Sequence, residues 1–264
     1  MSIGTILGVL FGFGLFIGAI AVSTDDPTVF MDLASFVMVV GLTLAATFIS
    51  FEARYVTLSL KLLYRIVFAP RIGRNILKSE VGRVIKWGYE VQKNGLGAVE
   101  KEIPKLKRSD KLLAYGVEMV ISGYTGAEVR EVMTNAIEST FIRNTVPADI
   151  LKSMGGTAPA CGMIGTLVGL IIMLGKMGSD PSALGPGLSV ALITTLYGVL
   201  FARLIFIPAG IKVKQREEIV RFRNYLIAEG LVMLADRKSP RAIQDRMNSF
   251  LDPSIHFNID KMKR

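Results

Sequence analysis

Residues 153–175 read SMGGTAPACGMIGTLVGLIIMLG, and residues 188–211 read LSVALITTLYGVLFARLIFIPAGI, with the break KMGSDPSALGPG at 176–187. Residues 153–175 hold no charge over 23 positions, and residues 181–202 hold none over 22. An uncharged apolar segment of about 20 residues matches the ~30 Å hydrocarbon core of a bilayer. The break contains Lys176, Asp180 and two prolines, which is typical of a loop at a membrane surface. This stretch predicts a transmembrane helical hairpin.

Small and hydroxyl-bearing residues mark the interior of the predicted hairpin. Gly162, Gly165 and Gly169 share one face, and small residues let helix backbones approach closely in lipid. Hydroxyl groups lie at membrane depth in both spans, at Thr157, Thr166, Thr194, Thr195 and Tyr197. Neither uncharged run contains Asp, Glu, Lys or His, so nothing there binds and releases a proton near neutral pH. If ions cross at this hairpin, another chain must supply the carboxylate.

Two further apolar runs stand at the start of the chain. Residues 3–22 are 20 uncharged residues, and residues 33–51 are 19 more, separated by a short acidic turn with Asp25 and Asp26. A signal peptide is the competing interpretation of the first run. It is disfavoured because no Lys or Arg precedes the run and the run exceeds the usual ~7–15 apolar residues. The chain therefore predicts an all-α membrane protein with four transmembrane helices.

The remaining segments are polar and predict helices outside the membrane. We expect transmembrane helices 1 and 2 in residues 1–52, a cytoplasmic helical domain in 53–152, helices 3 and 4 in 153–211, and cytoplasmic helices with a tail in 212–264. Apolar positions at helical spacing predict helices at 55–68, 76–92, 110–122 and 217–236. Thr125 and Glu128 have the capping-box spacing that begins a helix, which we expect to end near Arg143, before Pro147. Ser239 followed by Pro240 predicts one more short helix.

The net charge of +9 is a topology signal. Residues 51–154 hold 17 Lys and Arg and residues 210–264 hold 12, whereas residues 23–29 hold none and residues 176–186 hold one. The positive-inside rule places both basic segments, and with them both termini, in the cytoplasm. The basic surplus is therefore mainly a topology signal, so we expect membrane lipid but no nucleic acid as a partner.

The sequence offers no enzyme chemistry. The single cysteine, Cys161, lies inside the third apolar run, where a small packing residue is expected, and the single histidine, His256, lies in a polar tail where we expect it to be solvated. These residues provide neither a metal cluster nor a nucleophile with its base. We expect no catalytic residue, no bound metal and no cofactor.

Three stretches resemble one family. GTAPACGMIGTLVGL at 156–170, GPGLSVALITTLYGVLFARLIFIP at 185–208 and DLASFVMVVGLTLAATFISF at 32–51 resemble helices of the flagellar motor stator A-subunits, MotA and PomA. These belong to the wider MotA/TolQ/ExbB proton-channel family. One departure is Leu42 after Gly41, where the family usually has two glycines. The resemblance implies an inner-membrane ring, a pentamer around a dimer of a B-subunit whose Asp binds the ion, and a rotor switch protein as a further partner.

The resemblance also implies roles for particular residues. Pro159 and Pro208 match prolines that couple ion passage to the cytoplasmic domain. Glu100 matches an acidic residue that contacts the rotor. The basic partner of that residue is an Arg in the family, but here the position holds Gln92, so we expect Lys93 beside it to serve.

Thr166, Thr194 and Thr195 match hydroxyls beside the ion path. Because Thr194 and Thr195 are adjacent, they point about 100° apart, and we expect one to face the partner helices and the other a neighbouring subunit. Extra hydroxyl oxygens suit Na⁺, which needs several ligands, and the pair resembles the sodium-driven members, so sodium is favoured over proton.

Two alternatives stay open. A TolQ- or ExbB-type energiser of an outer-membrane system would usually have three spans, whereas this chain has a further hairpin at residues 3–51. A structural membrane scaffold without ion flux would not need threonines at membrane depth, although such residues also serve helix packing.

The Lys and Arg distribution makes the topology testable. Reporter fusions at Asp26 and Asp180 are expected to report a periplasmic location, and fusions at Lys105 and at the C-terminus a cytoplasmic one. A periplasmic signal from the Lys105 fusion would refute the four-span arrangement.

Overall fold

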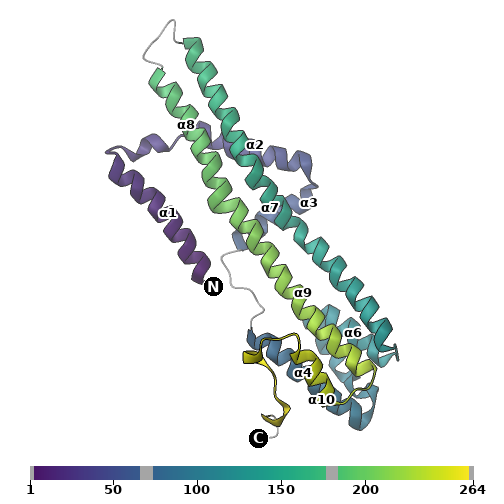
Figure 1. Cartoon of the computed structure of the whole chain (residues 1–264). Helices are drawn as coiled ribbons and strands as arrows, with labels where there is room; N and C mark the ends of the chain where they lie inside the picture. Colours follow the sequence, from purple (N-terminus) through teal and green to yellow (C-terminus); the bar gives the residue numbers. More distant parts are fainter. Residues whose placement is uncertain (1–2, 66–73, 177–183, 262–264) are drawn as a thin grey trace. The chain divides into compact units, whose positions relative to one another are not determined.

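The protein, seen here in a computed structural model, is described over residues 3–65, 74–176 and 184–261, and these residues form helices and their connections (Figure 1). The break at 176–187 and the end of the helix predicted at 55–68 fall partly outside the described residues. The longer helices are α1 (Ile3–Ser23), α2 (Leu33–Ser50), α3 (Ala53–Arg65), α4 (Arg74–Asn94), α6 (Lys111–Ile121), α7 (Gly126–Lys176), α8 (Leu184–Leu200), α9 (Ile207–Ala235) and α10 (Pro240–Asn248). The shorter ones are η1 (Pro27–Phe30), η2 (Leu96–Glu102), α5 (Ile103–Ser109), η4 (Phe201–Phe206), η5 (Pro253–Ile255) and η6 (Ile259–Lys261).

Four helical segments within the described residues are long and apolar enough to cross a membrane. They are Ile6–Ser23, Pro27–Ser50, Gly126–Lys176 and Leu184–Ala235. The large side chains of α1 face outward, including Leu10 at 65% and Phe11 at 69% exposure, as expected for a helix whose surroundings are lipid. The predicted all-α membrane fold with four candidate spans is confirmed.

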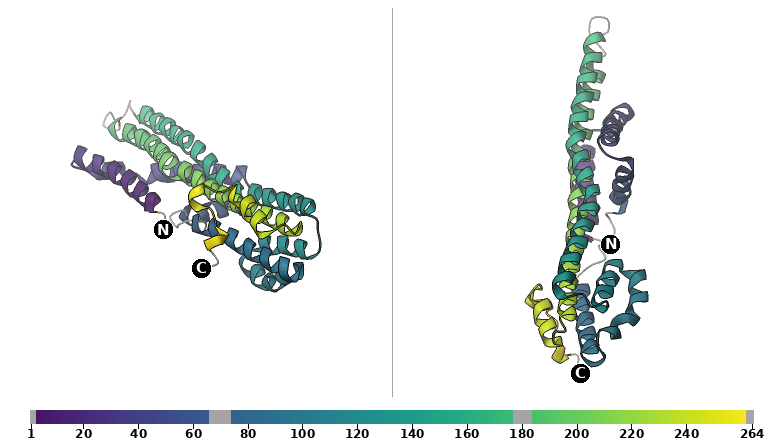
Figure 2. Two further views of the ribbon diagram at one scale, coloured as in Figure 1. Left: turned by 60° about the horizontal axis from the view of Figure 1, so that its bottom comes forward. Right: turned by 90° about the vertical axis from the view of Figure 1, so that its right-hand side faces the viewer.

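The chain divides into two compact units. The first unit comprises Met1–Ala69 and Thr145–Gln215, and the second comprises Pro70–Asn144 and Arg216–Arg264. Helices α7 and α9 each contribute one part to either unit. Within each unit the parts of α7 and α9 lie side by side (Figure 2), with Gly210 against Ala148 in the first unit and Asn144 bonded to Glu217 in the second. Each unit has its own buried cluster of apolar side chains.

Helices α7 and α9 are longer than the sequence indicates. α7 continues for 51 residues with Pro147 and Pro159 inside it, so the predicted end near Arg143 is wrong. The helix predicted to begin near residue 217 is likewise a continuation of the segment that starts at Leu184. Proline removes one hydrogen bond from a helix, which packing on either side can outweigh. Beside Pro147, α7 touches α9 closely, because a Cβ on Gly210 would lie 2.7 Å from the carbonyl oxygen of Ala148.

The predicted helix starts are present. The Thr125 backbone N–H donates to Oε2 of Glu128 at 2.8 Å, and the Glu128 N–H donates to Oγ1 of Thr125 at 3.3 Å, which is a complete capping box at the start of α7. Asp110 accepts from the backbone N–H of Leu113 at 3.0 Å at the start of α6. Ser239 accepts from that of Ala242 at 3.3 Å at the start of α10.

The second unit packs α4, α6, α7 and α10 around α9. Leu226, Ile227 and Leu231 of α9 are almost completely buried, together with Ile85 of α4. The C-terminal tail joins this core although its sequence lacks periodicity. Phe257 lies over Gly82 of α4, where a Cβ would come 2.7 Å from the phenyl ring. Asn248 holds the tail through two hydrogen bonds with the Phe257 backbone, at 2.8 and 2.9 Å.

Charged groups connect the helices of the second unit. Arg223 of α9 donates to Oε1 of Glu80 on α4 at 2.5 Å and also binds Asp110, the N-cap of α6. The Arg223 and Glu80 side chains are 12% and 4% exposed. Burial lowers the pKa of the Arg223 guanidinium, but the bonds to Glu80 and Asp110 raise it by more, so its pKa is raised overall. Elsewhere on α9, Arg221 donates to Glu138 of α7 at 2.7 Å.

Replacement of Arg223 by Met should destabilise the second unit by at most about 3–5 kcal/mol, because it leaves the buried Glu80 carboxylate with only the more exposed Arg83 as a partner, at 2.9 Å. It also removes the ion pair of half-buried Asp110. The single tryptophan, Trp87, is buried in this unit's core, so its fluorescence during heating of the full chain in detergent reports the change.

The matched control is Arg241→Met. Arg241 pairs with Asp260 at 3.7 Å, but the two side chains are 65% and 70% exposed. An exposed pair contributes about 0–1 kcal/mol, so the control should melt almost as the wild type does. Equal melting temperatures for the two variants would show that the buried cluster does not support the unit.

Candidate functional site between helices α7 and α8

The face of α7 that packs against α8 is made of glycines, and the two backbones touch there. A Cβ on Gly162 would lie 2.8 Å from the carbonyl oxygen of Thr194, and one on Gly165 would lie 2.7 Å from Cβ of Thr194. A Cβ on Gly169 would lie 3.1 Å from Cβ of Ala191. Gly198 of α8 completes the contact, since a Cβ there would lie 2.7 Å from the carbonyl oxygen of Ala158. Side chains larger than hydrogen at these positions would push the two helices apart.

The close approach brings two hydroxyl groups together. Oγ1 of Thr166 on α7 lies 2.5 Å from Oγ1 of Thr195 on α8. The Thr166 hydroxyl also lies within donating distance of two carbonyl oxygens, those of Gly162 at 3.1 Å and Ala191 at 3.0 Å. A hydroxyl has one proton, so when Thr166 donates to a carbonyl it must accept from Thr195. The Thr195 oxygen then keeps its lone pairs for a cation or a water molecule.

Thr194 has a different environment. Its side chain is 0% exposed, packs against Gly165, and donates to the carbonyl oxygen of Ala191 at 2.8 Å. Thr194 and Thr195 both contact α7 of their own chain, Thr194 through Gly165 and Thr195 through Thr166, although Thr194 is buried and Thr195 is half-buried. The expectation that one threonine faces the partner helices and the other a neighbouring subunit is therefore wrong for Thr194, whose side chain is covered within its own chain.

Tyr197 connects α8 to the start of α2. Its hydroxyl donates to the carbonyl oxygen of Phe30 at 2.5 Å and accepts from the backbone N–H of Asp32 at 3.2 Å. Its ring packs edge-on against Phe36 of α2, with centroids 6.3 Å apart. The carboxylate of Asp32 caps α2 by accepting from the N–H of Ser35 at 2.6 Å. The sequence indicates the Tyr197 hydroxyl but not its partner Asp32, since 165 residues separate them.

The two prolines named from the resemblance lie on neighbouring helices. Pro159 is inside α7, where its Cα would lie 3.1 Å from a Cβ placed on Gly198. Pro208 is exposed at the start of α9, directly after the π-helical turn η4. In η4 the Ile207 N–H donates to the carbonyl oxygen of Ala202, five residues earlier. A proline ring collides with the carbonyl four residues before it, here that of Leu204, and the wider turn relieves this contact.

The residues expected to contact the rotor lie in the second unit. Lys93 is exposed in the last turn of α4, and Glu100 is exposed in η2. Gly95 separates these elements with a φ of 78°, a left-handed conformation that favours glycine. Buried Val99 anchors η2 to the core, which leaves Glu100 facing outward. Both charges are therefore accessible to a partner.

The described residues contain no group of three or more His, Cys, Asp or Glu side chains that could hold a metal ion. Cys161 is buried in α7, and His256 is exposed, with Nε2 3.0 Å from the carbonyl oxygen of Leu251. The chemistry at the α7–α8 contact is that of hydroxyl and carbonyl oxygens. Fold and site together define a helical membrane protein with a polar helix contact that lacks its own ion-binding carboxylate.

Comparison with known proteins gives the family. Residues 105–224 match the model of the MotA/TolQ/ExbB proton channel family. The chain is 30% identical over 254 residues to Motility protein A of Borreliella burgdorferi, covering 96% of this chain and 95% of that one. It is 28% identical over 252 residues to Chemotaxis protein PomA of Vibrio alginolyticus, covering 96% of each. A structure of C. jejuni MotAB has the same fold, with a TM-score of 0.86, 23% identity and coverage of 96% and 97%.

The chain belongs to the MotA/TolQ/ExbB proton channel family, on the branch of the MotA and PomA stator subunits. This is a family of channel subunits rather than of enzymes.

The glycine contact generates a direct test. Gly165→Ala places a methyl group 2.7 Å from Cβ of Thr194, so the helices must separate, at a cost of roughly 1–3 kcal/mol. We expect a smaller fraction of the purified protein to remain monodisperse after heating in detergent. We also expect cells that carry this variant to swim less well. The control is Gly175→Ala in the same helix, where nothing lies within 4 Å of the added carbon. If both variants behave alike, the contact does not hold α7 against α8.

Proposed function

We propose that this chain is the channel-forming stator subunit of a flagellar motor, which couples ion flow across the inner membrane to rotation. The observation that carries the proposal is the Thr166–Thr195 hydroxyl pair, at 2.5 Å, in two apolar spans without any carboxylate. Such a pair can guide an ion but cannot bind it alone. Family membership and full-length similarity to motility proteins support the stator over a TolQ- or ExbB-type energiser.

The proposed partner is a B-subunit that carries the ion-binding Asp. The similar structure is that of a MotAB assembly, which supports such a partner. We propose that this chain forms a ring, a pentamer around a B dimer, with both termini in the cytoplasm. Thr195 and Thr166 would then line the path beside the partner's Asp. Thr194 would support the path by fixing the distance between α7 and α8, since it is completely buried.

Pro159 and Pro208 would couple ion passage to the second unit. Each lies in a helix that contributes to both units, α7 and α9 respectively. A π-helical turn lies before Pro208, and single π-helical turns inside α-helices are frequent at functional sites. A change at the hydroxyl pair would then reach Glu100 and Lys93, which we propose act on the rotor switch protein.

Sodium is the proposed ion. Na⁺ is held by several oxygen ligands, and Thr195 offers its lone pairs when it donates its proton to Thr166. Thr195→Ala removes this oxygen, and a polar contact to a charged group contributes roughly 1.5–3 kcal/mol. The Na⁺ concentration for half-maximal swimming speed should therefore rise about tenfold or more at fixed membrane potential.

Thr194→Ala is the comparison for this measurement. Its hydroxyl is buried against its own helix, so the variant should lose stability while its Na⁺ dependence stays near that of the wild type. Wild-type swimming that ignores Na⁺ would end the sodium proposal and leave the proton as the ion.

The rotor contact predicts a different defect. Charge reversal in Glu100→Lys or Lys93→Glu should lower torque on a tethered cell without lowering ion flux or assembly, because both side chains are exposed and lie in α4 and η2, which are not among the candidate spans. Lys238→Glu, an exposed charge in the turn after α9, is the control and should leave torque unchanged. Normal torque in both reversals would mean that these charges are merely solvated.

A further inference from the structure

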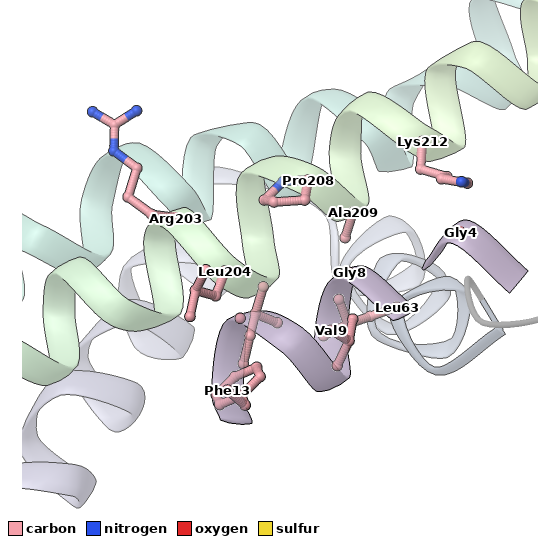
Figure 3. A pocket seen from close by; sticks show the side chains of 12 residues that line it. Gly4, Gly8, Val9, Phe13, Leu63, Arg203, Leu204, Pro208, Ala209 and Lys212 are labelled. Atoms are coloured by element: carbon pink, nitrogen blue, oxygen red, sulfur yellow. The ribbon is translucent and has the colours of Figure 1, made fainter. Parts of the chain in front are cut away.

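An apolar groove of about 440 Å³ lies in the first unit between α1 and the η4–α9 segment. Val9 and Phe13 of α1 line one wall, and Leu204 and Ala209 line the other. Figure 3 shows these side chains pointing into the space between the two helices. The volume falls in the range of small-molecule sites, which is about 300–1,000 Å³.

The groove exists because α1 presents glycines to it. Gly4, Gly8 and Gly12 repeat at intervals of four residues, a pattern that usually lets two helices touch. Here they do not touch. A Cβ on Gly4 or Gly8 would meet nothing within 4 Å, and one on Gly12 would meet only Leu204, at 3.7 Å. The glycines therefore leave an open groove along α1, a helix that is long and apolar enough to cross a membrane.

The charge on the groove is positive. Lys212 and Arg203 line it, and no acidic residue is among the described residues that do so. Lys212 lies at the same end as Gly4, whereas Phe13 and Leu204 lie at the other end (Figure 3). Residues beyond Lys212 turn strongly basic, with Lys214 and Arg216. Arg203 lies at the Phe13 end, and its guanidinium is directed away from α1 in Figure 3. Lys212 is therefore the cation at the end predicted to be cytoplasmic, and Phe13 and Leu204 mark the end deeper in the membrane.

We propose that this groove binds an anionic phospholipid of the cytoplasmic leaflet. One acyl chain lies along the glycines of α1 as far as Phe13, and the phosphate binds the Lys212 ammonium. Basic pockets between membrane helices on the cytoplasmic side suit such headgroups. Pro208 also lines the groove, so a bound lipid would brace the start of α9 beside the π-helical turn.

The test uses the full chain co-purified with its B-subunit in detergent and supplied with phosphatidylglycerol or phosphatidylcholine. Native mass spectrometry counts the retained lipid. The wild type should retain phosphatidylglycerol in preference to phosphatidylcholine. Lys212→Gln should reduce that preference about fivefold, the effect of one basic side chain near an anionic headgroup. Equal retention of both lipids by the wild type would overturn the proposal.

Gly8→Leu fills the groove, and its effect separates lipid from protein as the occupant. The control is Gly14→Leu, which adds the same side chain to α1 outside the groove, where nothing lies within 4 Å. We expect Gly8→Leu to lose most of the retained phosphatidylglycerol while the complex keeps its mass, and Gly14→Leu to retain the lipid. Loss of subunits in Gly8→Leu, with intact Gly14→Leu, would show that a second copy of the chain occupies the groove and would overturn the lipid site. Unchanged phosphatidylglycerol in Gly8→Leu would overturn it as well.

Discussion

Backbone contact between α7 and α8 is the constraint on which the membrane part of this protein depends. Because Gly162, Gly165 and Gly169 have no side chains, the Thr194 backbone and Cβ come within van der Waals distance of α7. That distance is what lets the Thr166 and Thr195 hydroxyls meet at 2.5 Å. If a methyl group on one of these glycines pushed the helices apart, the two oxygens would no longer lie within hydrogen-bond distance. The polar chemistry of the spans is thus a consequence of packing between apolar surfaces.

The same two long helices are held together differently in the two units. In the first unit, contact with α7 is made by small residues, as where Gly210 of α9 meets Ala148. In the second unit, side chains with charge and amide groups make the contact, as where Asn144 donates to Glu217 at 3.0 Å and Glu138 binds Arg221. In lipid the hydrophobic effect does not drive helices together, so the close packing of small residues must stabilise their contact. In the second unit, which we expect to be in water, burial of apolar side chains holds the core together, and charged pairs can form at the helix surface around it.

Much of this arrangement could be predicted from the sequence. Uncharged runs identified the spans, and local signals such as the Thr125–Glu128 capping box and Ser239 identified helix starts, because each depends on residues close in the chain. The continuity of α7 through Pro147 could not be predicted, since the contacts that outweigh the proline come from α9. The π-helical turn before Pro208 leaves no comparable signal. The different environments of Thr194 and Thr195, and the bond between Tyr197 and Asp32, follow only from tertiary structure.

The proposed ion path is incomplete within one chain for a chemical reason. Hydroxyl and carbonyl oxygens can replace part of an ion's hydration shell, but moving a charge through the membrane needs a compensating group at depth, and the spans 153–175 and 181–202 have none. Two structural features meet at this place: the half-buried hydroxyl pair and the buried Thr194 that fixes the helix distance. The π-helical turn before Pro208 lies further along the same helical segment. A partner's carboxylate would complete the path.

Ion flux into sealed vesicles tests this division of labour most directly. Vesicles with the full chain alone, vesicles with the chain and its B-subunit, and protein-free vesicles are compared at one imposed membrane potential. We predict that the chain alone conducts no more than protein-free vesicles, and that flux appears only when the B-subunit is present. Flux through the chain alone that equals flux through the complex would contradict the central claim.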